Sequence, residues 1–165
     1  MTLMVLAEKT DLSLSFLSQV ERGLTNPSIN SLRKIAFALG TPLNTFFEEG
    51  SSNNGPVVRK NDRRVLVSTD SRITYQLLSR DLNRRIEFLL TRLEVGGTSA
   101  ESPMSHKGEE VALVLQGECR FELEDEIYDL REGDSIYIDE NKPHKFTNTG
   151  KCTLIMVGAI SPPGF

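Results

Sequence analysis

A change of hydrophobic periodicity near residue 50 most constrains the fold of this chain. Residues 1–48 have apolar side chains at helical spacing, whereas residues 64–160 have short runs typical of strands. A polar stretch punctuated by glycine and proline, Glu48 to Pro56, separates the two segments. The sequence therefore predicts an α + β chain of two domains: an all-α unit over 1–48 and an all-β unit over 64–165, joined by a linker over 49–63.

Capping residues and apolar spacing predict the helices of the first segment. Thr2 and Ser13 are suited to cap helices over 3–9 and 14–22, with a three-residue turn between them. Apolar residues at 32, 35, 36 and 39 predict a third helix over 29–39 that ends at Gly40. Thr41-Pro42 favours the start of a fourth, short helix. Helix, short turn, helix is the pattern of a common DNA-binding motif.

The predicted helix over 14–22 has a distinctive polar face. Its residues at i, i+3, i+4 and i+7 are Ser15, Ser18, Gln19 and Arg22, which therefore share one side. Glutamine can bond adenine through two contacts, serine can bond bases or phosphate, and arginine can bond guanine or phosphate. The face suits the major groove of DNA, although a solvated helix surface is the alternative. Bulk charge does not decide between them, because 19 basic residues stand against 23 acidic ones.

The first segment resembles the phage-repressor-like helix-turn-helix family. The runs that carry the resemblance are Leu6-Ala7-Glu8-Lys9-Thr10, Phe16-Leu17-Ser18-Gln19-Val20-Glu21-Arg22-Gly23, Asn26-Pro27-Ser28 and Leu32 to Gly40. The resemblance implies that 14–22 is the recognition helix. It implies these DNA-binding residues: Thr2, Ser13, Leu14, Ser15, Ser18, Gln19, Arg22 and Asn26. Members of that family begin with a further helix, which we expect this unit to lack.

The second segment reads as short strands separated by turns, which predicts a sandwich or barrel. The expected strands span 65–67, 73–79, 86–95, 110–116, 119–124, 127–130, 135–138, 145–148 and 153–160. Val111 to Leu115 is apolar on both faces, so we expect cover from the barrel interior and from either a neighbouring sheet or a second subunit. Cys119 and Cys152 show no metal-ligand spacing, and we expect both to be free buried thiols.

The chain has only two histidines, and both stand in informative surroundings. His106 and Glu110 are four residues apart, and His144 follows a turn-rich stretch. Two imidazoles and a carboxylate form the ligand set of a facial triad, which suits iron, manganese, nickel or zinc. The alternative is a buried, hydrogen-bonded His144 beside Glu110 as a pocket acid.

Two motifs in this segment resemble those of the cupin superfamily. They are Met104-Ser105-His106-Lys107-Gly108-Glu109-Glu110, and Gly133 to Ile138 followed by Pro143-His144-Lys145-Phe146-Thr147-Asn148. The resemblance covers residues 64–165 and implies a double-stranded β-helix, or jelly-roll, barrel. It implies His106, Glu110 and His144 as metal ligands, with Met104 in the place of one further histidine. A thioether is a poor ligand for iron or manganese, so the barrel holds either one divalent metal on three ligands or a metal-free pocket. The candidate pocket residues are Tyr75, Met104, His106, Glu110, His144 and Phe146.

The order of the two units resembles that of bacterial cupin-type transcriptional regulators. This resemblance implies a homodimer that binds a double-stranded DNA operator and a small-molecule effector. No apolar run is long enough to cross a membrane and no leader is recognisable, so we expect a cytoplasmic protein without a membrane partner. One alternative is a non-haem metal-dependent enzyme, because hydroxypropylphosphonate epoxidases join the same two units and use a His/Glu/His iron site. Another is a metabolite-binding cupin whose helical unit serves only dimerisation.

Overall fold

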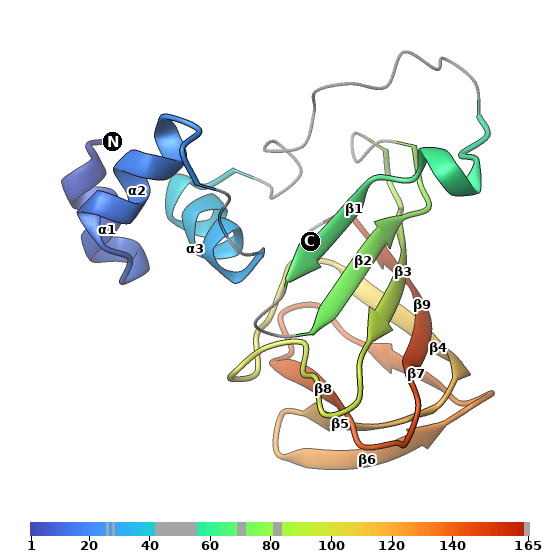
Figure 1. Cartoon of the computed structure of the whole chain (residues 1–165). Helices are drawn as coiled ribbons and strands as arrows, with labels where there is room; N and C mark the ends of the chain where they lie inside the picture. Colours follow the sequence, from blue (N-terminus) through green and yellow to red (C-terminus); the bar gives the residue numbers. More distant parts are fainter. Residues whose placement is uncertain (26, 28, 42–55, 69–71, 81–83, 164–165) are drawn as a thin grey trace. The chain divides into compact units, whose positions relative to one another are not determined.

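The structure is a computed structural model that describes residues 1–163 apart from 26, 28, 42–55, 69–71 and 81–83. The chain divides into two compact units, Met1–Gly50 and Ser51–Phe165, which are considered separately below (Figure 1). The short helix expected after Thr41 and the first part of the expected linker, 49–55, lie outside the described residues. The described remainder of that linker contains one turn of 3-10 helix, η2 (Lys60–Asp62).

The first unit contains α1 (Leu3–Thr10), α2 (Leu14–Glu21) and α3 (Ile29–Leu39), close to the predicted bounds. The Thr2 hydroxyl accepts a hydrogen bond from the Val5 amide at 3.4 Å, and the Ser13 hydroxyl accepts one from the Phe16 amide at 3.2 Å. These contacts satisfy amides that the first helical turn leaves without a partner. Of the helices described, none combines the length and the apolar character that crossing a membrane requires.

A small apolar core holds the three helices together. Each helix contributes one buried residue to the centre of this core: Leu6, Leu17 and Ile35. Partly buried side chains surround them, namely Leu3, Ala7, Leu12, Phe16 and Ala38. Because Leu17 anchors the buried side of α2, the opposite side of this helix faces outward.

The second unit contains nine strands among its described residues. They are β1 (Val65–Ser68), β2 (Ile73–Leu77), β3 (Glu87–Leu93), β4 (Glu109–Gln116), β5 (Glu118–Leu123), β6 (Glu126–Arg131), β7 (Ser135–Ile138), β8 (His144–Asn148) and β9 (Leu154–Ser161). Each lies within two residues of a predicted strand. Alternation within β5 is confirmed, because Cys119 and Phe121 are buried while Arg120 is exposed.

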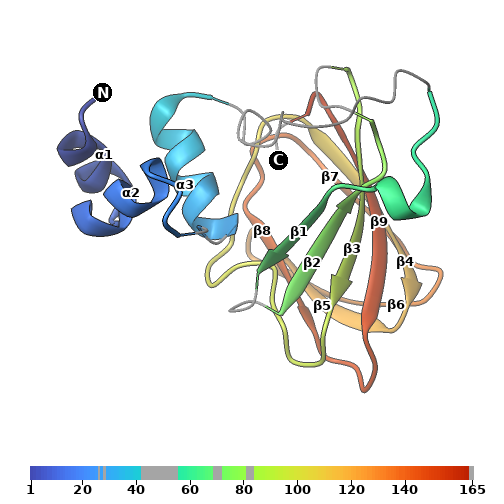
Figure 2. The same ribbon diagram turned by 45° about the horizontal axis from the view of Figure 1, so that its top comes forward.

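The strands form two antiparallel sheets that face each other, as the cupin prediction required (Figures 1 and 2). The larger sheet has the order β1-β2-β3-β9-β4-β7 and the smaller has β6-β5-β8. Phe121 of the smaller sheet and Ile73, Leu93, Ile138 and Leu154 of the larger are almost completely buried between them. Side chains from both sheets therefore pack into one core, which fills the interior of the barrel.

One expectation about burial is wrong for the described chain, and another is decided in part. Val111 and Leu115 are each 44% exposed on the outer face of β4, so no neighbouring sheet covers them, while cover by a second subunit stays a prediction. The reason is that the smaller sheet faces the inner side of β4, where Ala112 and Val114 are buried. Cys119 is buried as expected, but Cys152 is exposed because it lies between β8 and β9.

Candidate functional site

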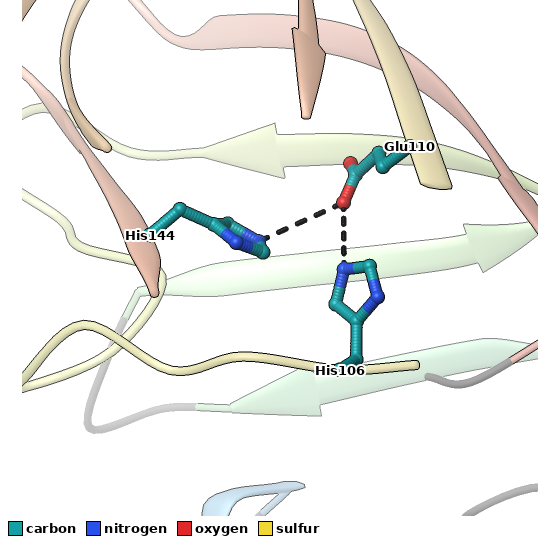
Figure 3. Close-up of side chains that lie close together, drawn as sticks. All are labelled: His106, Glu110 and His144. Atoms are coloured by element: carbon teal, nitrogen blue, oxygen red, sulfur yellow. Dashed lines mark hydrogen bonds and ion pairs between the residues drawn. The ribbon is translucent and has the colours of Figure 1, made fainter. Parts of the chain in front are cut away.

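Three polar side chains meet between the two sheets (Figure 3). His106 precedes β4, Glu110 lies in β4, and His144 begins β8 on the opposite sheet. Glu110 Oε2 lies 3.0 Å from His106 Nε2 and 3.7 Å from His144 Nε2. The three side chains are 12–16% exposed, and one potential ligand atom from each lies within 4.8 Å of the others. The structure thus brings together the three residues of the predicted facial triad.

The second nitrogen of each imidazole faces a backbone carbonyl. His144 Nδ1 lies 2.9 Å from the carbonyl oxygen of Lys142, and His106 Nδ1 lies 3.2 Å from that of Lys107. A carbonyl only accepts, so a hydrogen bond at either Nδ1 makes that nitrogen the donor. A protonated His106 donates from Nε2 to Glu110, whereas a neutral ring that carries its proton on Nδ1 leaves Nε2 free to bind a cation. When both rings are neutral with the proton on Nδ1, two nitrogen lone pairs and a carboxylate converge, and a proton or a metal cation among them would stabilise the arrangement.

A glycine between His106 and Glu110 allows both side chains to enter the barrel. Gly108 has a φ of 94°, a conformation that favours glycine. A Cβ atom there would lie 2.5 Å from the carbonyl oxygen of Pro162 and 2.9 Å from that of Ser161. The close approach of the segment after β9 therefore requires glycine at this position.

A second glycine makes room for the carboxylate, and the predicted site did not include it. A Cβ atom on Gly158 in β9 would lie 3.1 Å from Glu110 Oε1. Glycine within a strand often marks a place where another group approaches closely. The isolated glycine in the apolar run Leu154 to Ile160 was therefore a usable signal.

Aromatic side chains line one side of the cluster. The Phe121 ring stacks on His144, with centroids 5.9 Å apart, and on Phe146, with centroids 5.8 Å apart. Phe146 is therefore close to the site as predicted, while Phe121 is an additional neighbour that the predicted pocket lacked. Tyr75, also a predicted pocket residue, is buried on β2. It pairs with Thr91, which pairs with Met156, whereas Glu110 pairs with Ile160, so Tyr75 lies in a different row of the sheet from Glu110.

The second candidate site is the outward face of α2. Leu14 is 49% exposed, and Ser15, Gln19 and Arg22 are also exposed, whereas Ser18 is half-buried. Arg22 Nε donates to the carbonyl oxygen of Ser18 at 3.1 Å, which orients the guanidinium at the end of the helix. The hydroxyls of Thr2 and Ser13 act as helix caps, and the predicted contact Asn26 lies outside the described residues.

Comparisons with family models agree with both units. Residues 1–46 match the helix-turn-helix model and residues 89–158 match the cupin domain model. The chain is therefore a two-domain protein that joins an N-terminal helix-turn-helix domain to a cupin domain.

Several known proteins are similar to nearly the whole of this chain. The chain is homologous to the HTH-type transcriptional regulator PuuR of Escherichia coli, to which it is 28% identical over 96% of this chain and 86% of the relative. A crystal structure of an HTH_3 family transcriptional regulator from Vibrio cholerae is similar, with a TM-score of 0.71 at 22% identity over 98% of this chain and 86% of that one. Hydroxypropylphosphonic acid epoxidase from S. wedmorenis has a TM-score of 0.56 at 20% identity over 97% and 89% of the two chains.

Proposed function

We propose that this protein is a sequence-specific DNA-binding transcriptional regulator whose cupin barrel binds a small-molecule effector. The observation that supports it best is the exposed hydrogen-bonding face of α2, held outward by the packed Leu17 and by the Ser13 cap. The regulators among its relatives support the same function. In this proposal the protein acts in the cytoplasm, where it binds DNA. It does not catalyse a reaction.

In this proposal α2 enters the major groove of DNA. Leu14 can contact a thymine methyl group, Gln19 can bond adenine, and Ser15 and Ser18 can bond bases. Thr2, Ser13 and Arg22 lie at helix ends, where phosphate contacts are common. The remaining member of the predicted set, Asn26, lies outside the described residues and is proposed as a phosphate contact from the family resemblance alone.

Selection of DNA from a random pool, followed by footprinting, tests the proposal. Gln19→Ala should lower affinity for the selected operator by about 1–3 kcal/mol, the usual value of a base contact made through two hydrogen bonds. Glu8→Gln, at an exposed position on α1, is the matched control and should bind the operator at least as well. Failure of the unchanged protein to enrich or protect any sequence would show that the proposal is wrong.

The outer face of the larger sheet supports a homodimer. Phe88, Ala159, Val111 and Tyr137 pair across β3, β9, β4 and β7. Phe88, Val111 and Tyr137 are 39–54% exposed, which leaves a continuous apolar row uncovered. A second copy related by a twofold axis would cover the row with its own equivalent and present two recognition helices to a palindromic operator.

The dimer has a simple test in solution. Val111→Lys should convert a dimer into a monomer in light-scattering measurements and weaken operator binding. Val95→Lys is the matched control, since Val95 is 47% exposed but lies in the turn after β3. A monomeric unchanged protein, or a dimeric Val111→Lys variant, would contradict this interface.

The cluster of His106, Glu110 and His144 is the proposed effector site. Its partly buried carboxylate beside two imidazoles favours a ligand that brings positive charge, either a metal ion or the cationic group of a metabolite. Met104 and Phe146, which flank His144, complete the proposed pocket. Thermal unfolding with a panel of metal ions and amines tests the site, and lack of stabilisation by every cation would exclude it.

An iron-dependent oxygenase is the second candidate function. The His/Glu/His cluster and the fold shared with the S. wedmorenis epoxidase favour it specifically. Three protein ligands would leave positions on iron for substrate and dioxygen, the chemistry that the metal would supply. Oxygen consumption by the iron-loaded protein with a phosphonate substrate would favour the enzyme, and its absence together with operator binding favours the regulator.

A further inference from the structure

We propose that the effector of the barrel is a copper(I) ion and that Met104 is a fourth ligand beside His106, Glu110 and His144. This inference rests on the proposed effector site and specifies the cation that it takes. It also assigns a function to Met104, which stands where the first cupin motif would place a further histidine.

The backbone places Met104 directly opposite His144. The Met104 amide donates to the His144 carbonyl at 2.9 Å, and the His144 amide donates to the Met104 carbonyl at 3.0 Å. Residues paired in this way have side chains on the same side of the ladder, with Cβ atoms roughly 4.5–5.5 Å apart. Since His144 points towards Glu110, the Met104 side chain leaves the backbone on the same side of the ladder as the cluster.

Exposure along the chain supports the same orientation. Met104 and His106 are partly buried, whereas Ser105 and Lys107 are exposed. This alternation puts Met104 and His106 on the inner side of the segment. A methionine side chain has three rotatable bonds and adapts readily to such a position.

The donor set favours copper(I) over harder or divalent ions. A thioether and two imidazoles are ligands that copper accepts, while a thioether adds little to the binding of manganese or iron. Glu110 supplies the single negative charge of the set. A monovalent ion therefore neutralises the four proposed ligands taken together.

Affinity for copper(I) tests the role of Met104. The measurement uses anaerobic competition with bicinchoninate and the full chain carrying Cys152→Ser, because Cys152 is an exposed thiol. Met104→Leu should lower copper(I) affinity at least tenfold and leave zinc(II) affinity within about twofold. Met156→Leu is the matched control, since Met156 is buried in the barrel beside Val114, four residues along β4 from Glu110.

X-ray absorption at the copper edge provides a direct readout. One sulfur neighbour is expected in the Cys152→Ser protein and in its Met156→Leu variant, and none in Met104→Leu. Saturating copper(I) should also change operator affinity only while Met104 is present. Cation binding with no sulfur neighbour, or with equal copper(I) affinity in Met104→Leu, would overturn the copper inference alone. Absence of binding by every cation would instead refute the proposed effector site.

Discussion

Replacement of Glu110 by glutamine should separate the requirement for a cation from ordinary stabilisation of the fold. The carboxylate faces the Nε2 atom of His106 at 3.0 Å, and both atoms are acceptors when the ring is neutral and carries its proton on Nδ1, which faces the Lys107 carbonyl. The amide introduced by Glu110→Gln can donate a hydrogen bond across that distance. At pH 8, where imidazole is ordinarily neutral, and in chelator, the variant should be more stable by about 0.5–1.5 kcal/mol.

Addition of a cation that binds the site should make the unchanged protein more stable than the Glu110→Gln variant. A ligand at a hundred times its dissociation constant stabilises by about 2.7 kcal/mol, which raises the melting temperature of the second unit, Ser51–Phe165, by about 10 °C. The Glu110→Gln variant should show little increase. The assay is thermal unfolding followed by circular dichroism, with Glu109→Gln, at a neighbouring exposed residue, as the control. A Glu110→Gln variant that melts several degrees below the unchanged protein in chelator would refute the reasoning.

Three further changes test other parts of the molecule. Gly158→Ala should reduce cation affinity about tenfold, roughly 1.4 kcal/mol, because the new methyl group displaces Glu110; unchanged affinity in titration calorimetry would contradict this. Asn148→Ala should lower the free energy of unfolding in urea by about 2–4 kcal/mol, since three hydrogen bonds of 2.9 Å are lost; a loss below 1 kcal/mol would count against it. Burial, with a smaller effect of Asp129, raises the pKa of Cys119 to about 12, so at pH 8 an aromatic disulfide reagent should titrate Cys152 alone. Reaction of two thiols per folded chain would be the contrary result.

Much of the fold was predictable because its signals are local. Thr2 and Ser13 indicate where helices begin, because their hydroxyls accept hydrogen bonds from the amides three residues later. The alternation around Phe121 likewise reports one buried and one wet face of a strand. Such patterns depend on neighbours in the sequence, and the structure confirms the elements that they predicted.

The details of the candidate site depend on contacts between distant segments. The spacing of His106 and Glu110 suggested a shared face, but Gly108 and the chain around Ser161 set the turn that brings both side chains inward. The carbonyl partners of the two imidazoles have no sequence signature, because every residue has a carbonyl. The apolarity of Val111 was visible in the sequence, whereas its 44% exposure on the outer face of β4 was not, because it depends on which strands the larger sheet places around it.

The position of β4 in the larger sheet also governs when the site can form. Glu110 pairs with Ile160, 50 positions later in the chain, and Glu109 pairs with Ser161. The Gly158 backbone that faces the carboxylate belongs to the same late strand. During synthesis, His106, Glu110 and His144 all leave the ribosome before β9 can dock between β3 and β4. The nascent cluster therefore lacks its final geometry until β9 is in place, and sheet closure over so long a separation is expected to be the slow step of folding.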